Sequence, residues 1–232
     1  MEMKCLAIIT ARGGSKRIPR KNIKPFLGAP IIKYSIDAAL KSKCFDEVMV
    51  STEDHEIAAI AKSFGAKVPF FRSKETAKDH STLVDVIDEV IFEYKKRGVS
   101  FKYFCCILPT VPFISSQLLK KSFLMLDKSK SDSLIPITKF NVPIQQGIRI
   151  INNNIKLLNE KSWKTRSQDY EQIYYDCGMF YWMKVNSFLK QKDLFATDCV
   201  PFVISELQIQ DIDTKEDWEM AQLKYKLLNK LI

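Results

Sequence analysis

The residues best suited to chemistry in this sequence lie in a short basic segment near its start. Residues 11–22 read ARGGSKRIPRKN and contain five Lys/Arg, two adjacent glycines, a serine and no acid. They follow an apolar run, residues 5–10, that predicts a buried strand. Two glycines let backbone N–H groups turn toward one point and let a ligand approach closely, and such groups beside basic side chains form a concavity for a polyanion. We therefore expect this segment, here called the phosphate loop, to hold a triphosphate.

The alternative interpretation of the phosphate loop is a solvated basic surface. Its glycine spacing matches neither G-x-x-x-x-G-K-[ST] nor G-x-G-x-x-G, which are two common phosphate-binding patterns. Its position directly after a predicted strand favours phosphate binding, because backbone donors meet phosphates at that place in many α/β proteins.

Two aspartates near the other end of the chain form a second candidate. Asp211 and Asp213 are separated by Ile212, so in an extended segment both carboxylates would lie on one face while Ile212 points inward. Two converging carboxylates suit Mg²⁺, a hard cation that takes oxygen ligands and keeps several waters. The same acids precede a predicted helix, whose dipole they would complement. The spacing alone leaves both interpretations open.

Composition bounds the class of protein. The 232 residues suit one α/β domain with an insertion or a small lobe. The net charge of +9 favours an anionic ligand, which could be a nucleotide, a nucleic acid or a membrane surface. Six cysteines form no C-x-x-C motif and predict reduced thiols in a cytoplasmic protein. Two histidines are too few for a zinc site or a Ser-His-Asp relay built in the usual way. We expect no signal peptide and no membrane span.

The elements that must position these residues alternate between strand and helix. This alternation predicts a mainly parallel sheet covered by helices. The most apolar strand, residues 103–108, should be central, and Thr110 follows it at the edge of the sheet where ligands bind in open α/β folds. The predicted strands span residues 5–10, 47–51, 68–71, 103–108 and 133–138, and the predicted helices span 31–41, 55–64, 82–97 and 117–127.

The pattern changes after residue 138. Residues 148–151 and 155–158 flank three asparagines and predict a β-hairpin. An isolated hairpin is marginal in water, so it needs a surface to pack on, and another subunit is one candidate. Strands at 179–182 and 202–204 and a short helix at 185–190 follow. Thr214 and Asp217 predict a capping box that opens a C-terminal helix ending near residue 228.

The phosphate loop also resembles a known signature. Residues 11–22 are similar to A-R-x-x-S-K-x-[LI]-P-x-K-N, found in the cytidylyltransferases that activate nine-carbon sialic-type sugars. The resemblance covers nearly the whole chain and is weakest over residues 139–173. It implies one Rossmann-like nucleotidyltransferase domain, residues 1–232, in which about 139–175 form a protruding β-rich dimerisation lobe of a homodimer. It implies CTP and a nine-carbon sugar acid as substrates, with a CMP-sugar and pyrophosphate as products.

The resemblance also implies roles for individual residues. Arg72 would lie near the cytosine, and Arg12, Lys21 and Asp211 would be catalytic, with Asp211 as the candidate base. Asp211 and Asp213 would bind Mg²⁺. Thr110, Asp176 and Tyr181 are candidates for binding the sugar. Asp176 and Tyr181 belong to an aromatic run that could instead be core; we favour core for Phe180 and Trp182 and the sugar site for Asp176 and Tyr181. The residues implied for nucleotide binding are Ala11, Arg12, Gly13, Gly14, Ser15, Lys16, Asn22, Arg72, Asp79 and Ser81.

The choice of sugar depends on few residues. Leu108 stands where the sialic-acid enzymes usually carry Gln, and residues 174–182 are rich in tyrosine. Both features favour pseudaminic acid over N-acetylneuraminate, legionaminate or Kdo, which are the alternatives. A basic nucleic-acid-binding protein is the alternative from another class. No recognition-helix pattern, aromatic stacking ladder or basic tail supports it, so we predict neither a nucleic-acid nor a membrane partner.

Overall fold

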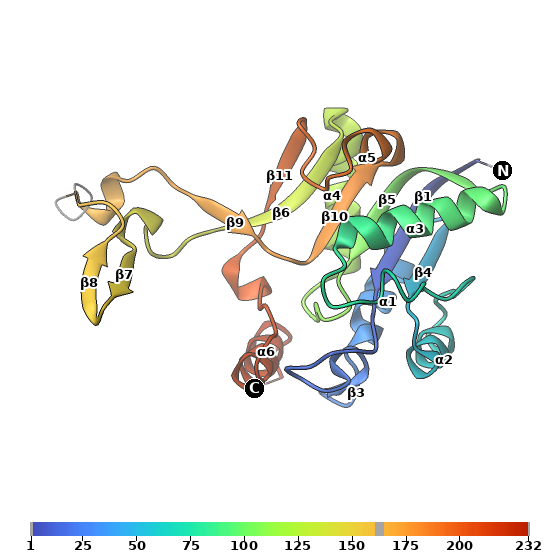
Figure 1. The fold of residues 1–232 in the computed structure, drawn as a ribbon, viewed down its shortest axis with the longest axis horizontal. Helices are drawn as coiled ribbons and strands as arrows, with labels where there is room; N and C mark the ends of the chain where they lie inside the picture. The colour runs from blue at the N-terminus through green and yellow to red at the C-terminus, as the bar shows by residue number, and fades with distance from the viewer. Residues whose placement is uncertain (1, 161–164, 232) are drawn as a thin grey trace.

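The structure, a computed structural model, describes residues 2–160 and 165–231 (Figure 1). It has a body built on one sheet and an arm that extends from it. Within the described residues the main sheet contains seven strands, β1 (Glu2–Thr10), β4 (Glu47–Ser51), β5 (Ser100–Ile107), β6 (Ser133–Lys139), β9 (Tyr174–Asp176), β10 (Phe180–Lys184) and β11 (Cys199–Val203). The helices are α1 (Ile32–Ser42), α2 (His55–Ser63), α3 (Leu83–Lys96), α4 (Ser116–Ser129), α5 (Val185–Gln191) and α6 (Lys215–Leu228).

The strand order is β11-β6-β10-β5-β1-β4, with β9 paired to β6. β1 is parallel to β4 and β5, and β11 is parallel to β6, whereas β10 and β9 are antiparallel to their neighbours. The predicted Rossmann-like fold with a mainly parallel sheet is therefore confirmed. Because β4 lies on one side of β1 and β5 on the other, the chain changes direction at β1. The carboxyl ends of β1 and β5 form the kind of switch point at which open α/β sheets bind ligands.

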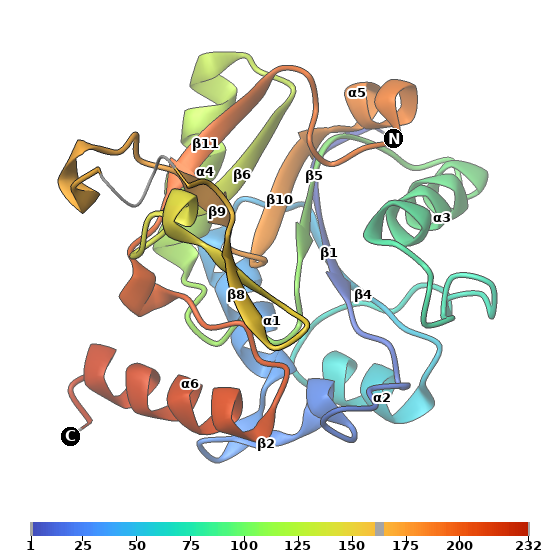
Figure 2. The same cartoon turned by 60° about the vertical axis from the view of Figure 1, so that its left-hand side comes forward.

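Two hydrophobic clusters cover the two faces of this sheet. One contains Ile32 and Ile36 of α1 with Leu119 and Phe123 of α4, and the other contains residues of α3 and α5 (Figure 2). Ile32 and Ile36 are four residues apart and so lie on one face of α1, and both are fully buried. All six cysteines are free thiols, as expected from their spacing.

The strand predicted over residues 68–71 is wrong. The only pairing in this region is a single bridge between Met49 and Lys67. Pro69 has no N–H to donate and so cannot continue a ladder beside β4. The chain instead turns toward the sheet edge, where the Arg72 N–H donates to the carbonyl of Thr52 at 2.9 Å.

The C-terminal helix brings the Asp211 segment to the phosphate loop. The capping box is confirmed, since the Thr214 side chain accepts from the Asp217 N–H and the Asp217 carboxylate accepts from the Thr214 N–H. Trp218 of α6 is buried against Phe26, with ring centroids 5.6 Å apart. Phe26 belongs to β2 (Pro25–Phe26), which pairs with β3 (Ala29–Pro30) just after the phosphate loop. The C-terminal helix is therefore packed against the segment that follows the phosphate loop.

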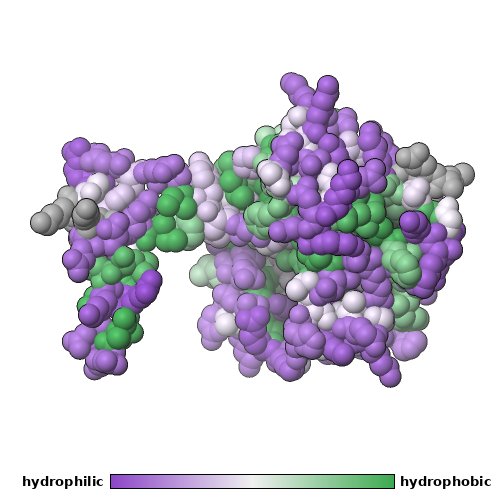
Figure 3. All heavy atoms as spheres, turned by 45° about the horizontal axis from the view of Figure 1, so that its top comes forward, coloured by the Kyte–Doolittle hydropathy of each residue, from purple (hydrophilic) through white to green (hydrophobic). Residues whose placement is uncertain are grey.

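The arm, whose described residues are 140–160 and 165–173, stands away from the body in Figure 1. Its hairpin, β7 (Ile148–Ile151) and β8 (Asn154–Leu157), confirms the predicted one, and Asn152 and Asn153 take the positive φ of a tight type I′ turn. Ile150 and Ile155 face each other in the register but remain 76% and 69% exposed. Figure 3 shows hydrophobic surface along the arm that the body does not cover. Among the described residues, no helix is both long and apolar enough to cross a bilayer.

Candidate active site

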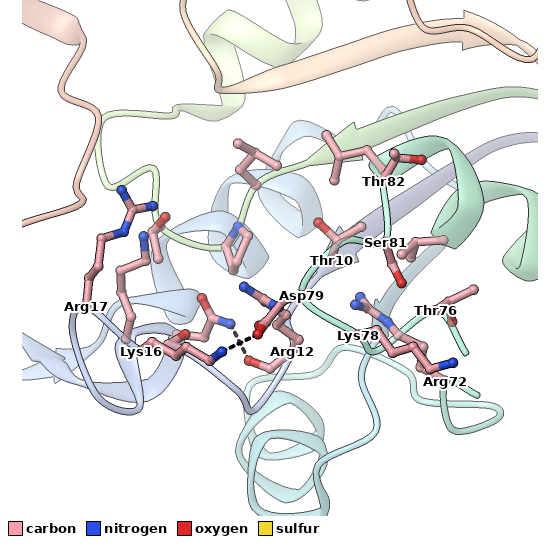
Figure 4. Close-up of a pocket in the computed structure, with 18 of the residues that line it drawn as sticks. Thr10, Arg12, Lys16, Arg17, Arg72, Thr76, Lys78, Asp79, Ser81 and Thr82 are labelled. Carbon is pink, nitrogen blue, oxygen red and sulfur yellow. Dashed lines mark hydrogen bonds and ion pairs between the residues drawn. The ribbon is translucent and has the colours of Figure 1, made fainter. Parts of the chain in front are cut away.

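A cavity of about 490 Å³ lies at the carboxyl ends of β1 and β5 (Figure 4). Three segments line it: the phosphate loop, the connection that leads into α3, and the residues that follow β5. Of the residues predicted from sequence, the ones that line the cavity are Arg12, Ser15, Lys16, Lys21, Asn22, Arg72, Asp79, Ser81 and Thr110. The topology thus brings together residues that are up to 98 positions apart in the chain, as Arg12 and Thr110 are.

The cations of the phosphate loop that line the cavity are all paired with acids. On one side, Arg12 donates to the Asp79 carboxylate at 2.6 Å, and Lys16 donates to the same carboxylate. These two hydrogen bonds, first that of Lys16, lower the pKa of Asp79 below its ordinary value. Figure 4 shows the three side chains meeting at the cavity. Asp79 therefore occupies the position that an anionic ligand of Arg12 and Lys16 would take.

On the other side, Asp213 holds two further cations of the loop. Arg17 lies 2.7 Å from one carboxylate oxygen, and the Lys21 ammonium lies 3.3 Å from the other. Lys21 also donates to the carbonyl of Ile212 at 2.6 Å. Ile212 is buried, so the alternation predicted for Asp211, Ile212 and Asp213 is present. Neither aspartate lines the cavity itself. Asp213 faces the phosphate loop through Arg17 and Lys21, whereas Asp211 is exposed.

The backbone of the phosphate loop is fixed by the body. Buried Asn22 donates its amide to the carbonyl of Arg12 at 2.8 Å, which closes the loop on itself. The Ala11 N–H donates to Ser51, and the Gly13 N–H donates to the Glu53 carboxylate at 2.7 Å. Ala11, Gly13 and Gly14 do not line the cavity. The Gly13 amide points to Glu53, so Ser15 and the basic side chains supply the loop's surface toward a ligand.

Arg72 is a buried cation beside the cavity, with 7% of its surface exposed. It donates to the hydroxyl of Ser51 at 3.0 Å and to the carbonyl of Ser51 at 2.7 Å. Burial lowers its pKa, and the nearby carboxylates of Glu53 and Glu89 act against that shift. Ser81 donates its hydroxyl to the Glu75 carbonyl at 2.8 Å. These bonds hold the connection to α3 in place.

The two aromatic-run candidates lie away from the cavity. The Tyr181 hydroxyl donates to Asp176 at 2.7 Å, and the same carboxylate accepts from the Gly178 N–H at 2.9 Å. Burial, followed by this hydrogen bond, raises the pKa of Tyr181 far above its ordinary value. Neither residue lines the cavity. Thr110, in contrast, lines it directly after β5 and beside Leu108.

Comparison with known proteins agrees with this geometry. Residues 6–229 match the cytidylyltransferase family over nearly the whole chain. This chain belongs to that family. It is 39% identical to a pseudaminic acid cytidylyltransferase of Campylobacter jejuni subsp. jejuni serotype O:2, with 97% of both chains covered. It is 29% identical to a CMP-N,N'-diacetyllegionaminic acid synthase of Legionella pneumophila, with 95% of both covered.

Solved structures show the same fold at lower identity. A CMP:2-keto-3-deoxy-manno-octonic acid synthetase complexed with CTP superposes with a TM-score of 0.71 at 16% identity, over 99% of this chain and all of that one. A 4-diphosphocytidyl-2C-methyl-D-erythritol synthase of Anaerococcus prevotii superposes with a TM-score of 0.64 at 16% identity, over 96% and 98%. Both have the nucleotidyltransferase fold of the cytidylyltransferase described here.

Cytidylyltransferases generally depend on a divalent metal ion. Asp213 offers hard oxygen donors beside the phosphate loop, and the exposed Asp211 lies two residues before it in the chain, which fits an ion that shares its remaining positions with phosphates and water. Among the described residues no cluster of three or more His, Cys, Asp or Glu side chains could hold a metal. The donor set therefore suits a metal that arrives with a phosphate ligand.

Sequence reasoning missed the residues that hold the phosphate loop. Ser51, Glu53 and Asp54 follow or end β4 and contact the loop or Arg72, but none was a candidate. Their signal in the sequence was a polar run, STED, at the end of a buried strand predicted to be parallel to the first. The carboxyl ends of neighbouring parallel strands lie at one edge, so this run had to lie beside the phosphate loop.

Proposed function

We propose that this cytidylyltransferase transfers CMP from CTP to a nine-carbon sialic-type sugar acid, with pseudaminic acid favoured, and releases pyrophosphate. One observation carries the proposal: four cations of the phosphate loop, Arg12, Lys16, Arg17 and Lys21, converge on one cavity at the switch point of the sheet. A triphosphate needs this density of positive charge. The relatives named pseudaminic acid cytidylyltransferase support the choice of sugar.

The reaction is an in-line displacement at the α-phosphorus of CTP by the anomeric hydroxyl of the sugar acid. Negative charge develops on the non-bridging oxygens and on the leaving pyrophosphate, so positioning and electrostatics supply most of the catalysis. Arg12 and Lys21 would neutralise charge near the α-phosphate, and Lys16 would act further along the triphosphate. Ser15 also lines the cavity.

The carboxylates of Asp211 and Asp213 would hold Mg²⁺, which would supply charge neutralisation at the triphosphate. Asp213 is now bound to Arg17 and Lys21, so a triphosphate that takes those two cations would release its carboxylate. Asp211 is our candidate to accept the proton of the anomeric hydroxyl. Its side chain is exposed to solvent.

The cytosine would lie near Arg72 and Ser81, on the α3 side of the cavity. Asp79 would compete with the triphosphate for Arg12 and Lys16, since a carboxylate and a phosphate oxygen seek the same donors. The sugar acid would lie near Thr110. Leu108 lines the same part of the cavity and offers no hydrogen bond from its side chain, which favours a sugar with an apolar group there. Asp176 and Tyr181 would act on the sugar only if their mutual hydrogen bond opened.

The arm would form the interface of a symmetric homodimer. Its isoleucines are exposed in the single chain, and the proposed partner is a second copy that covers them.

An assay of pyrophosphate release tests the proposed function. It crosses CTP, UTP and ATP with pseudaminic acid, legionaminic acid, N-acetylneuraminate and Kdo. We expect release with CTP only, and the highest kcat/KM with pseudaminic acid. An equal or higher kcat/KM with N-acetylneuraminate would reject the sugar preference. Salt-sensitive binding to DNA without any turnover of CTP would reject the enzyme in favour of nucleic-acid binding.

A further inference from the structure

The end of β4 holds the phosphate loop at both of its ends. At the start of the loop, the Gly13 N–H donates to Glu53 at 2.7 Å. Near its end, the two terminal nitrogens of Arg20 bind the two carboxylate oxygens of Asp54 at 2.5 and 3.0 Å. Glu53 and Asp54 are consecutive, so one short acidic segment, here called the clamp, fixes two points of the loop that are seven residues apart.

The fit between the clamp and the loop is close. A Cβ on Gly13 would lie 2.6 Å from a carboxylate oxygen of Asp54, so only glycine allows this approach. Arg20 has a φ of 55°, in the left-handed region, which a non-glycine residue adopts at some cost. The bidentate pair with Asp54 accompanies that strained backbone, and it is the stronger kind of ion pair.

The Glu53 side chain lies in a place where burial makes its ionised carboxylate unfavourable. Its second carboxylate oxygen is buried and has no hydrogen-bond partner among the described residues. An unsatisfied buried oxygen destabilises a fold. Its charge lies near the guanidinium of Arg72, which burial would otherwise make less favourable as a cation. Glu53 therefore connects the loop at Gly13 with the cation that lines the opposite side of the cavity.

We propose that Glu53 and Asp54 are positioning residues for the nucleotide. Neither lines the cavity, so they act through the loop: they hold Gly13 and Arg20 so that Arg12, Lys16 and Lys21 face the triphosphate. This inference rests on the proposed function. It assigns to the clamp the affinity for the triphosphate and not the affinity for the sugar acid.

The Arg20–Asp54 pair can be tested without unfolding α2. Asp54 also caps that helix by accepting from the Ile57 N–H at 2.9 Å, and Asn caps helices about as well as Asp. Asp54→Asn therefore keeps the cap and removes the charge. We expect it to raise the KM for CTP about tenfold, as the loss of a charge-assisted hydrogen bond does. The KM for the sugar acid should stay within about twofold, and the variant should remain folded at the assay temperature.

Three further variants separate the pair from its surroundings. Arg20→Gln should reproduce the effect of Asp54→Asn, and the double variant should be no worse than either, because the two residues act as one unit. Glu56→Gln is the matched control. Glu56 also binds Arg20, but its side chain is 66% exposed, so its loss should change the KM for CTP by less than about twofold.

Glu53 is tested by a truncation and its rescue. Glu53→Ala leaves the Gly13 N–H without its acceptor and should raise the KM for CTP about tenfold. Glu53→Gln keeps an acceptor oxygen and should restore most of that loss. The proposal would be overturned if each substitution raised the KM for CTP and the KM for the sugar acid by the same factor, because a general structural role would affect both substrates alike.

Binding of inorganic tripolyphosphate, measured by calorimetry, separates failure of the clamp from failure of the proposed function. If the unmodified protein does not bind tripolyphosphate, the triphosphate site itself is wrong, and the clamp falls with it. If the unmodified protein and Asp54→Asn bind it equally well, the site stands and the clamp is overturned. We expect the unmodified protein to bind and Asp54→Asn to bind about tenfold more weakly.

Discussion

Around the cavity each basic side chain of the phosphate loop has an acidic partner from the same chain, whereas on the arm the isoleucines of β7 and β8 are left largely exposed. Arg12 and Lys16 share Asp79, Arg17 and Lys21 share Asp213, and Arg20 binds Asp54. Ile150 and Ile155 on the arm have no comparable cover. The charged groups of the body thus find partners within one chain, whereas the apolar side chains of the arm are left exposed to solvent.

The two regions therefore differ in the interactions that they offer to a ligand or partner. In the body, ion pairs and hydrogen bonds set geometry and can be exchanged for bonds to a phosphate ligand. On the arm, apolar area is available for association, at roughly 25 cal/mol per Å² removed from water. Substitutions in one region should therefore leave the properties of the other unchanged, and the following predictions test that separation.

The largest effect is expected from Lys21→Ala. Lys21 belongs to the phosphate loop, pairs with Asp213 and lines the cavity. Removing one preorganised charge contact commonly lowers kcat by about 10²–10³-fold, and we expect that loss here with no change in oligomeric state. Asp211→Ala should behave alike if Asp211 acts in the reaction. Lys62→Ala, on the exposed side of α2, is the control and should keep full activity. A kcat close to that of the unmodified protein at saturating CTP and Mg²⁺ would remove the substituted residue from the mechanism.

The next effect concerns the arm. Ile150→Asp and Ile155→Asp place charges on the exposed hairpin, so they should weaken a dimer by about 10–100-fold each, in line with the burial of one isoleucine side chain. The dissociation constant is measured by analytical ultracentrifugation over a range of concentrations. The thermal unfolding of the body should not change. A monomeric unmodified protein at micromolar concentration would contradict the predicted homodimer.

The sequence predicted those parts of the fold that local patterns decide. Regular patterns were sufficient for the strand of residues 47–51, for the inner face of α1 and for the hairpin with its asparagine turn, since local chemistry decides each of them. The prediction of a strand at 68–71 was wrong although these residues are largely apolar. Pro69 cannot donate to a neighbouring strand, and the Arg72 side chain is held by hydrogen bonds to Ser51.

The site was predicted where the signal lay in one segment and missed where it depended on contacts across the chain. Four of the five basic side chains of the phosphate loop line the cavity, and the fifth, Arg20, binds Asp54 instead. The direction of the Gly13 amide could not be read from the sequence, because it depends on a carboxylate 40 residues away. The partnership of Asp176 with Tyr181 arises from the antiparallel insertion of β10, which one sequence does not reveal.

A smaller effect is expected at Asp79. Asp79→Asn removes the carboxylate that binds Arg12 and Lys16, so the KM for CTP should fall by about two- to fivefold, with a larger change at low ionic strength. Steady-state kinetics at two salt concentrations measures it. A rise in the KM for CTP would show that the Asp79 carboxylate helps to bind the nucleotide. It would contradict the proposal that Asp79 competes with the triphosphate for Arg12 and Lys16.

The smallest effect is a pH dependence of stability. The hydrogen bond from Arg20 lowers the pKa of Asp54 to about 2 from its ordinary value of 3.8. A lowered pKa stabilises the folded state above the unfolded value, and the contribution is lost as the pH falls from about 4 to about 2. The difference in urea midpoint between the unmodified protein and Asp54→Asn should be constant from about pH 5 to 7 and shrink below about pH 4. A difference that does not change with pH would exclude the ion pair as its source.

The most direct test of the central claim is identification of the reaction products. The protein is incubated with CTP, Mg²⁺ and pseudaminic acid, and the products are resolved by anion exchange and weighed by mass spectrometry. We predict one pyrophosphate for each CTP consumed, together with a product that has the mass of CMP joined to the sugar acid, and neither without the sugar. Consumption of CTP without that conjugate, or no consumption with any nine-carbon sugar acid, would contradict the assignment.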